Sequence, residues 1–307
     1  MLARFLIFAA GAELALYLVA GARICRQLGV SLIWGVPLAI LAVLLTGAMI
    51  VALSFVLSRR HAAAPRSTER LTGARKLQLF VSEALAFVAL FTLLQPLDRW
   101  LTPRPPGGTM RAGHLPVLLV PGIYCNAALW WWMRRRFRAR GLGSVWAITL
   151  GPPLADIDQL ARDLSRHIAQ VCEATSAPQV VLVTHSMGGL TARACLRDPS
   201  TRRRVAKIVS LAAPHHGSEL ARWAVGLNAR QLRPGNAWLE ALNAAEPPPV
   251  PIVSLFSWHD NFVAPQDSPV LAHATNVPLT GIGHLSLVFS KAVALRVYEE
   301  ILSASQM

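Results

Sequence analysis

The first hundred residues are dominated by three long apolar runs. Residues 5–22 and 31–57 are each long enough to cross a hydrocarbon core about 30 Å thick at about 1.5 Å per residue. We expect both to be membrane helices, and the second run argues that this front end is not a cleaved signal peptide. We expect the third run, 77–97, to span as well, although a helix lying on the membrane or against the rest of the protein is the alternative. This run contains the polar residues Ser82, Glu83 and Gln95.

Two carboxylates lie within these apolar runs, Glu13 and Glu83. Carboxylates inside a membrane are costly and often functional. Because only two are present and no further ionisable residues accompany them, we interpret both as groups that form hydrogen bonds between helices.

Beyond residue 100, short apolar runs alternate with amphipathic segments. Residues 101–114 are rich in proline and glycine and predict a linker between a transmembrane region, 1–100, and an α/β domain, 115–307. The alternation predicts a mostly parallel sheet of about six strands with helices on both faces. We expect strands near 115–121, 145–150, 180–185, 207–212, 251–256 and 277–279. We expect one helix to end near 140, a second to begin at 156 and a third to end near 196. Two further helices are expected near 237–242 and at 285–302.

The central stretch, residues 180–190, reads Val-Val-Leu-Val-Thr-His-Ser-Met-Gly-Gly-Leu. An apolar strand, a turn of small residues and a helix start predict a nucleophile elbow with Ser186 at its apex. The stretch fits G-x-S-x-G except at Thr184, where the pattern has glycine. A larger residue there puts the close approach of strand and helix in question.

A nucleophilic serine needs an imidazole that takes its proton and a carboxylate that orients the imidazole. Asp260 follows the strand at 251–256 by a few residues, where the acid is expected, and Asp267 is its competitor further on. His284 lies in the glycine-rich turn Gly-Ile-Gly-His before the last helix and is the best candidate base. We interpret His185 and His259 as supporting residues.

An oxyanion hole needs two backbone N–H donors. We expect one from Met187, which follows the nucleophile, and the other from Ile123, with Tyr124 as the less favoured choice. His215 and His216 are adjacent but have no acidic or thiol partners nearby, so we expect no metal and no cofactor. The four cysteines show no C-x-x-C spacing, and one disulfide is left open.

The chain has a formal net charge of +14 at pH 7, with basic runs at 134–136 and 202–204. No recognition motif accompanies these runs, so we expect no nucleic-acid partner. Between the second and third apolar runs only Glu69 opposes the basic residues Arg59, Arg60, Arg66, Arg70, Arg75 and Lys76. The positive-inside rule therefore places this segment in the cytoplasm. If 77–97 spans, the α/β domain is on the periplasmic side of a bacterial inner membrane, which we expect; if not, it is cytoplasmic.

Five motifs resemble the α/β-hydrolase superfamily and, within it, the bacterial triacylglycerol lipase and esterase group. They are Val-Pro-Gly-Ile-Tyr at 120–124, Thr-His-Ser-Met-Gly-Gly at 184–189, Ala-Pro-His-His-Gly-Ser at 213–218, His-Asp-Asn-Phe-Val-Ala-Pro at 259–265 and Gly-Ile-Gly-His at 281–284. The resemblance covers roughly 115–304. It implies an α/β-hydrolase fold with Ser186 as nucleophile, Asp260 as acid, His284 as base, and Ile123 and Met187 as oxyanion donors. In such enzymes a cap or lid lies between the strands ending near 213 and beginning near 251. This connection is short here, so we expect a small lid and a fairly open pocket.

Together these features predict a membrane-anchored serine hydrolase that cleaves carboxylic esters of apolar acyl chains through an acyl-enzyme. The expected partners are a lipid or other acyl-ester substrate and the bilayer, and the oligomeric state is left open. Acyl transfer or thioester hydrolysis on the same triad is the alternative within enzymes. A catalytically inactive hydrolase fold that serves as a membrane scaffold is the alternative outside them.

Overall fold

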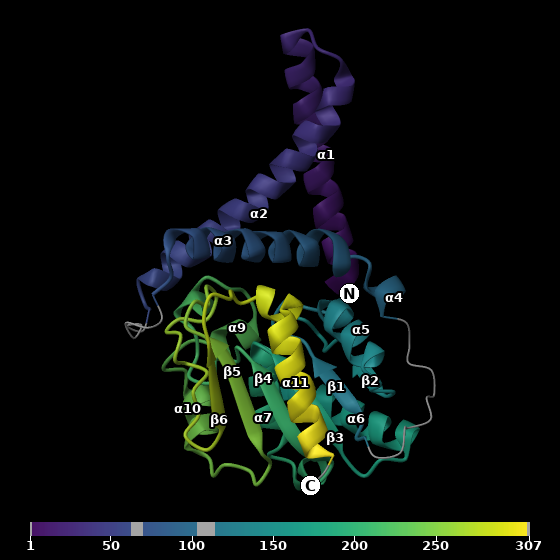
Figure 1. Cartoon of the computed structure of the whole chain (residues 1–307), viewed down its shortest axis with the longest axis vertical. Helices are drawn as coiled ribbons and strands as arrows, with labels where there is room; N and C mark the ends of the chain where they lie inside the picture. The colour runs from purple at the N-terminus through teal and green to yellow at the C-terminus, as the bar shows by residue number, and fades with distance from the viewer. Residues whose placement is uncertain (1, 63–69, 103–113, 306–307) are drawn as a thin grey trace.

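The computed structural model describes residues 2–62, 70–102 and 114–305 (Figure 1). An α/β domain, residues 115–305, lies beneath a helical region, residues 2–101. Most of the predicted linker, 103–113, lies outside the described residues.

Six strands form one sheet in which every neighbouring pair is parallel. Their order across the sheet is β2-β1-β3-β4-β5-β6, so the direction of winding reverses between β1 and β3. The predicted mostly parallel sheet of about six strands is therefore confirmed. The strands are β1 (Val117–Val120), β2 (Val145–Ala147), β3 (Val180–His185), β4 (Val205–Leu211), β5 (Ile252–Ser257) and β6 (Thr275–Leu279).

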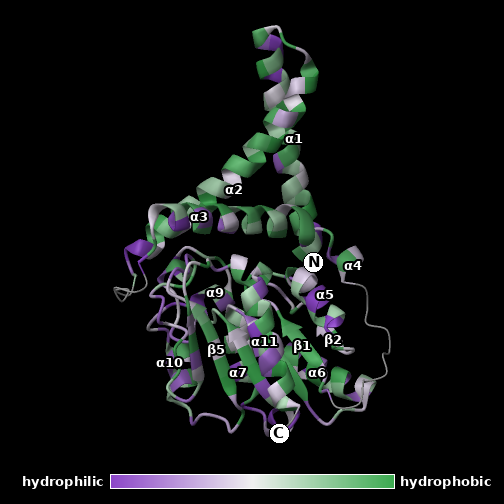
Figure 2. Cartoon of the chain, viewed as in Figure 1, coloured by the Kyte–Doolittle hydropathy of each residue, from purple (hydrophilic) through white to green (hydrophobic). Residues whose placement is uncertain are grey.

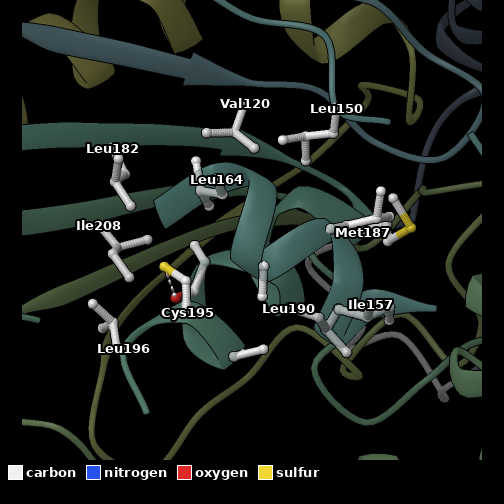
Figure 3. Close-up of a cluster of buried hydrophobic side chains, with 14 of the residues drawn as sticks. Val120, Leu150, Ile157, Leu164, Leu182, Met187, Leu190, Cys195, Leu196 and Ile208 are labelled. Atoms are coloured by element: carbon white, nitrogen blue, oxygen red, sulfur yellow. Dashed lines mark hydrogen bonds between the residues drawn. The ribbon is translucent and has the colours of Figure 1, made fainter. Parts of the chain in front are cut away.

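Helices cover both faces of the sheet. Alternate residues of the central strands point to opposite sides, so each of these strands contributes to two hydrophobic cores. Leu118 and Leu182 belong to the core shared with α6 (Ile157–Thr175), α7 (Met187–Cys195) and α10 (Ala237–Ala244), part of which is drawn in Figure 3. Leu119 and Val183 belong to the opposite core, which is shared with α5 (Trp131–Ala139) and α11 (Lys291–Ala304). Both faces of β3 are fully buried, which explains its continuous apolar sequence.

Local sequence sets the ends of these helices. The Asp156 carboxylate accepts a hydrogen bond from Gln159 N at 2.7 Å and caps α6 at the position predicted. The predicted single helix over 285–302 is wrong in one respect. It is divided into a short 3₁₀ helix, η6 (Ser286–Phe289), and α11, because Ser290 is extended and its hydroxyl caps Val293 N. The helix predicted to end near 140 begins as a short 3₁₀ helix, η4 (Ala127–Trp130), which α5 continues. Short helices that the pattern did not predict are α8 (Pro199–Arg202), η5 (Glu219–Arg222) and α9 (Leu227–Gln231).

Three of the described helical stretches are long and apolar enough to cross a membrane: Leu2–Leu28, Leu32–Arg59 and Gly73–Leu94. The first two form a hairpin of α1 (Leu2–Leu28) and α2 (Gly35–Arg59), joined through the short 3₁₀ helix η1 (Leu32–Trp34). Figure 2 shows that the hairpin consists largely of hydrophobic residues, and many of its large apolar side chains are exposed. Such a surface is typical of helices in contact with lipid. Tyr17 and Thr46 join the two helices through a hydrogen bond of 2.6 Å between their hydroxyls.

The third stretch, α3 (Gly73–Val88) and its π-helical continuation η3 (Ala89–Leu94), has a different orientation. It lies across the α/β domain rather than alongside the hairpin (Figure 1). One face packs on the domain through Leu79, Glu83, Ala86 and Leu90, all buried. The opposite face is apolar and exposed at Leu77, Val81, Leu85 and Leu93. The helix is followed by α4 (Asp98–Leu101).

Replacing Leu164 with alanine tests the packing of α6 on the sheet. This side chain is fully buried in the core drawn in Figure 3, far in sequence from the candidate site residues. We expect Leu164→Ala to lower the free energy of unfolding by about 2–5 kcal/mol, because a cavity remains. Thermal unfolding of the detergent-solubilised protein measures this as a lower Tm. Leu295→Ala, at an exposed position on α11, is the matched control and should leave Tm nearly unchanged.

Candidate active site

The candidate site lies where the winding of the sheet reverses, between β1 and β3. In open parallel sheets this point leaves a crevice at the carboxyl ends of the strands. Ser186 follows β3 directly, and the turn Pro121–Tyr124 follows β1. A Cβ added at Gly122 would lie 2.8 Å from the Ser186 Cβ, so the two turns are in close contact.

Ser186 has a backbone conformation that non-glycine residues rarely adopt, with φ 53° and ψ −128°. The surrounding structure maintains it: Ser186 N donates to Leu211 O of β4 at 2.8 Å, and α7 begins at the next residue. Such a strained turn between a strand and a helix is what the predicted elbow requires.

The glycines after Ser186 allow α7 to pass close to its neighbours. A Cβ at Gly188 would lie 2.7 Å from Pro121 O, and one at Gly189 would lie 2.4 Å from the Ala213 Cβ. Thr184, which departs from the elbow pattern, is fully buried. Its hydroxyl would be 3.4 Å from a Cβ at Gly189. The larger residue therefore fits beside this glycine.

Asp260 and His284 form a buried pair. Asp260 Oδ2 lies 2.7 Å from His284 Nδ1, and Asp260 Oδ1 accepts hydrogen bonds from Phe262 N and Val263 N, each at 2.8 Å. The two backbone donors fix the carboxylate so that its second oxygen faces the imidazole. The competing candidate, Asp267, is exposed, so the structure brings Asp260 rather than Asp267 to the histidine.

The pKa of His284 reflects two opposing effects. Burial lowers it, because the charged imidazolium loses hydration, whereas the Asp260 carboxylate raises it through its charge and hydrogen bond. A smaller contribution from the charge of Glu83 also raises it, and the net result is a pKa above the usual 6.5. The protonated form of the imidazole is therefore stabilised where it forms.

The two neighbouring histidines hold the backbone around His284. Nε2 of His185 donates to the carbonyl oxygen of His284 at 3.1 Å. Burial and the nearby His284 lower the pKa of His185 to about 3, so its ring is neutral. His259 Nδ1 accepts from Gly281 N at 3.1 Å, at the start of the same turn. Both contacts agree with the supporting roles expected for these residues.

Hydrogen bonds with the helical region hold the turn that is expected to supply an oxyanion donor. Asn126 N donates to Gln95 Oε1, and the Asn126 side chain donates to Gln95 O, both at 2.9 Å. Within the turn Tyr124 has φ 56°, and its hydroxyl accepts a hydrogen bond from Val225 N at 2.7 Å. The backbone donors at Ile123 and Met187 stay a prediction.

A cavity of about 450 Å³ opens over Ser186 and His284. The connection between β4 and β5 contributes a small cap through Leu220, Trp223 and Ala224, as its length predicted. The expectation of a fairly open pocket, however, did not include the N-terminal apolar helices, which form a further wall. The α/β domain contributes mainly Ile123, Tyr124, His185, Pro214, Phe262 and Leu285. The wall from the helical region consists of Ile50, Leu53, Ser54 and Leu57 of α2, Phe87 of α3 and Phe91 of η3.

Comparisons with known proteins identify the fold. Residues 150–296 match the family described as "PGAP1-like alpha/beta domain". Among solved structures, Bacillus licheniformis lipase BlEst2 in mature form is similar at 17% identity and a TM-score of 0.55, over 63% of this chain and 94% of that one. Aspergillus fumigatus lipase B gives 15% identity and a TM-score of 0.59, over 85% and 84%. The metagenomic carboxyl esterase MGS0156 gives 17% identity and a TM-score of 0.53, over 65% and 78%. A comparison with curated proteins gives no match.

The chain has the α/β-hydrolase fold. The fold that the five sequence motifs imply is thereby confirmed. No group of three or more potential ligands among His, Cys, Asp and Glu could hold a metal ion within the described part of the chain. The cysteines are Cys25, Cys125, Cys172 and Cys195, and all are free and buried.

Sequence reasoning missed three polar residues of the helical region that contact the α/β-hydrolase domain. Besides the Gln95 contacts, Ser54 Oγ of α2 accepts a hydrogen bond from the Asn261 side chain at 2.7 Å. Glu83 of α3 accepts from Leu285 N and Ser286 N. The interpretation that Glu83 forms a hydrogen bond between membrane helices is therefore wrong. The signal was present in the sequence, because a buried polar side chain in an apolar helix needs a partner.

Replacing Asp260 with asparagine tests the buried pair of Asp260 and His284. We expect Asp260→Asn to slow phosphonylation of Ser186 by a fluorophosphonate by a factor of roughly 10³ to 10⁴, because the imidazole loses its orienting carboxylate. Labelling of the wild type should increase as pH rises through the raised pKa of His284, since only the neutral imidazole accepts the serine proton. The time course of labelling, followed by mass spectrometry, measures both effects. Asp267→Asn is the matched control, and an equal loss in that variant would contradict the assignment.

Proposed function

We propose that this protein is a membrane-anchored serine hydrolase that cleaves carboxylic esters through an acyl-enzyme intermediate. The observation that carries the proposal is the buried Asp260–His284 pair at 2.7 Å beside the cavity that also exposes Ser186 in its strained turn. The similar lipases and esterases support the reaction class by their fold.

In the proposed mechanism, Ser186 Oγ attacks the ester carbonyl while His284 takes its proton. Asp260 holds Nδ1 of His284, which directs the other ring nitrogen to the serine, and it stabilises the imidazolium. The N–H groups of Met187 and Ile123 stabilise the oxyanion. His284 then returns the proton to the leaving alcohol, and the acyl group stays on Ser186. Water activated by His284 attacks this ester, and the carboxylic acid is released.

The proposed substrates are lipid esters with apolar acyl chains. The cavity volume falls in the range of about 300–1,000 Å³ typical of ligand pockets. Aromatic and aliphatic side chains form most of its lining, among them Leu53, Phe87 and Phe91 of the apolar helices. An acyl chain that leaves the bilayer beside these helices would therefore remain in apolar surroundings until its carbonyl reaches Ser186. Trp223 of the small cap, directly after η5, is 78% exposed and suits an interfacial position.

Hydrolysis of p-nitrophenyl esters of increasing acyl length by the detergent-solubilised protein tests the reaction. We expect activity that depends on acyl length, and Ser186→Ala should lower kcat by about 10⁵ or more, because the nucleophile is lost. Transfer of the acyl group to an added alcohol or thiol in preference to water would favour the acyltransferase alternative. A wild type that cleaves no ester or thioester and does not react with a fluorophosphonate would overturn the proposal and favour the scaffold.

We also propose that the catalytic domain is on the cytoplasmic side. If α1 and α2 cross the membrane, the end of α2 returns to the side of the α/β domain, and α3 follows along the surface of that domain. The exposed apolar face of α3 then lies in the interface, as in monotopic helices. This arrangement favours the alternative in which residues 77–97 do not span, rather than the expected periplasmic location. The basic segment that begins at Arg59 and the catalytic domain then share one side.

Reporter fusions in a bacterial host test this orientation. Green fluorescent protein joined after Met307 should fluoresce, and alkaline phosphatase at the same position should be inactive, because the former works in the cytoplasm and the latter in the periplasm. The control fusion after Val30, between α1 and α2, should give the opposite pair of results. Active phosphatase after Met307 would show that the third helix spans.

A further inference from the structure

Glu83 is the one acidic residue of α3, and its side chain is fully buried where the helix packs on the α/β domain. Its neighbours along the helix, Ser82 and Ala84, lie at the part-buried edges of the packed face. Burial of an unpaired carboxylate costs several kcal/mol, so its position needs a specific partner. That partner is the backbone immediately after the candidate base.

The two carboxylate oxygens bind two consecutive amides. Oε1 accepts from Leu285 N at 2.8 Å, and Oε2 accepts from Ser286 N at 2.9 Å. Both oxygens act as acceptors, as expected of an ionised carboxylate. The glycine at 283 makes the approach possible, because a Cβ there would lie 2.6 Å from Glu83 Cδ.

A second contact from the helical region is linked to the same turn through Asn261. His284 N donates to Asn261 Oδ1 at 3.1 Å, and the Asn261 amide donates to Ser54 Oγ of α2 at 2.7 Å. Three successive amides, those of residues 284, 285 and 286, are therefore held by side chains. Two of these bonds are made by α3 directly, and the third is linked to α2 through Asn261.

We propose that Glu83 is a positioning residue of the active site, which fixes the turn carrying His284 from within an apolar helix. The inference rests on the proposed function for the role of His284. Glu83 contacts the backbone after the base and does not line the cavity over Ser186, so it acts on the reaction through His284. The titratable groups facing His284 are Asp260, Glu83 and the neutral His185.

Glu83→Gln and Glu83→Ala in the full-length detergent-solubilised protein test this role. Glutamine keeps the size but can accept only one of the two amides, and alanine accepts neither. Ser82→Ala is the matched control, because the Ser82 hydroxyl donates to Leu79 O of its own helix. Four readouts are measured: kcat and KM on a p-nitrophenyl ester, the pH profile of kcat/KM, hydrogen exchange of residues 281–290, and Tm.

We expect kcat to fall about 10- to 100-fold in Glu83→Ala and less in Glu83→Gln, with KM unchanged, because the base is displaced while the cavity wall remains. The acidic limb of the pH profile should shift to lower pH in both variants. Removing the Glu83 charge lowers the pKa of His284, so the neutral base persists at lower pH. Exchange at residues 281–290 should accelerate in both variants and stay at the wild-type rate in Ser82→Ala.

Wild-type kcat, pH profile and exchange in both Glu83 variants would overturn the proposal. So would a lower Tm and kcat in Glu83→Ala combined with fully wild-type behaviour of Glu83→Gln, because that pattern indicates packing alone. If the wild type cleaves no ester, the proposed function fails separately. The exchange data and the rate of fluorophosphonate labelling at Ser186 then still decide whether Glu83 positions the turn.

Discussion

A buried polar group in an apolar helix must find a hydrogen-bond partner, and this requirement determines how the two parts of the protein fit together. Ser54, Glu83 and Gln95 each lie in an apolar stretch of the helical region. Each forms a hydrogen bond with a different loop at the carboxyl edge of the sheet. Because water is excluded from these contacts, each missing partner would cost free energy. The contacts therefore set the orientation of α3 across the domain.

Those three loops are the ones that the proposed chemistry needs. Asn261 follows the acid, Leu285 follows the base, and Asn126 follows the turn expected to donate to the oxyanion. The strained turn at Ser186 is held differently, by β4 and by glycines within the domain. The nucleophile is thus positioned by the sheet, while the groups that serve it are positioned partly by helices that the sheet does not contain.

This division explains what sequence reasoning could predict. The strands, the elbow at Ser186 and the choice of Asp260 and His284 follow from local patterns and from chain order, which the sequence states directly. The division of the last helix at Ser290 was missed because an apolar periodicity continues through it. The contacts of Ser54 and Glu83 join residues about 200 positions apart, and no local pattern specifies such pairs. Their polarity within an apolar run indicated that a partner exists, but not which one.

The packing of α3 also affects which part of the chain can fold as a unit. Ala86 and Leu90 belong to the same hydrophobic core as α5 and α11, although residues 103–113 separate them along the chain from that domain. A fragment that begins at residue 115 would therefore lack part of its own interior and would expose apolar side chains to solvent. The linker predicted from the sequence separates two segments of the chain, but one hydrophobic core contains residues of both segments.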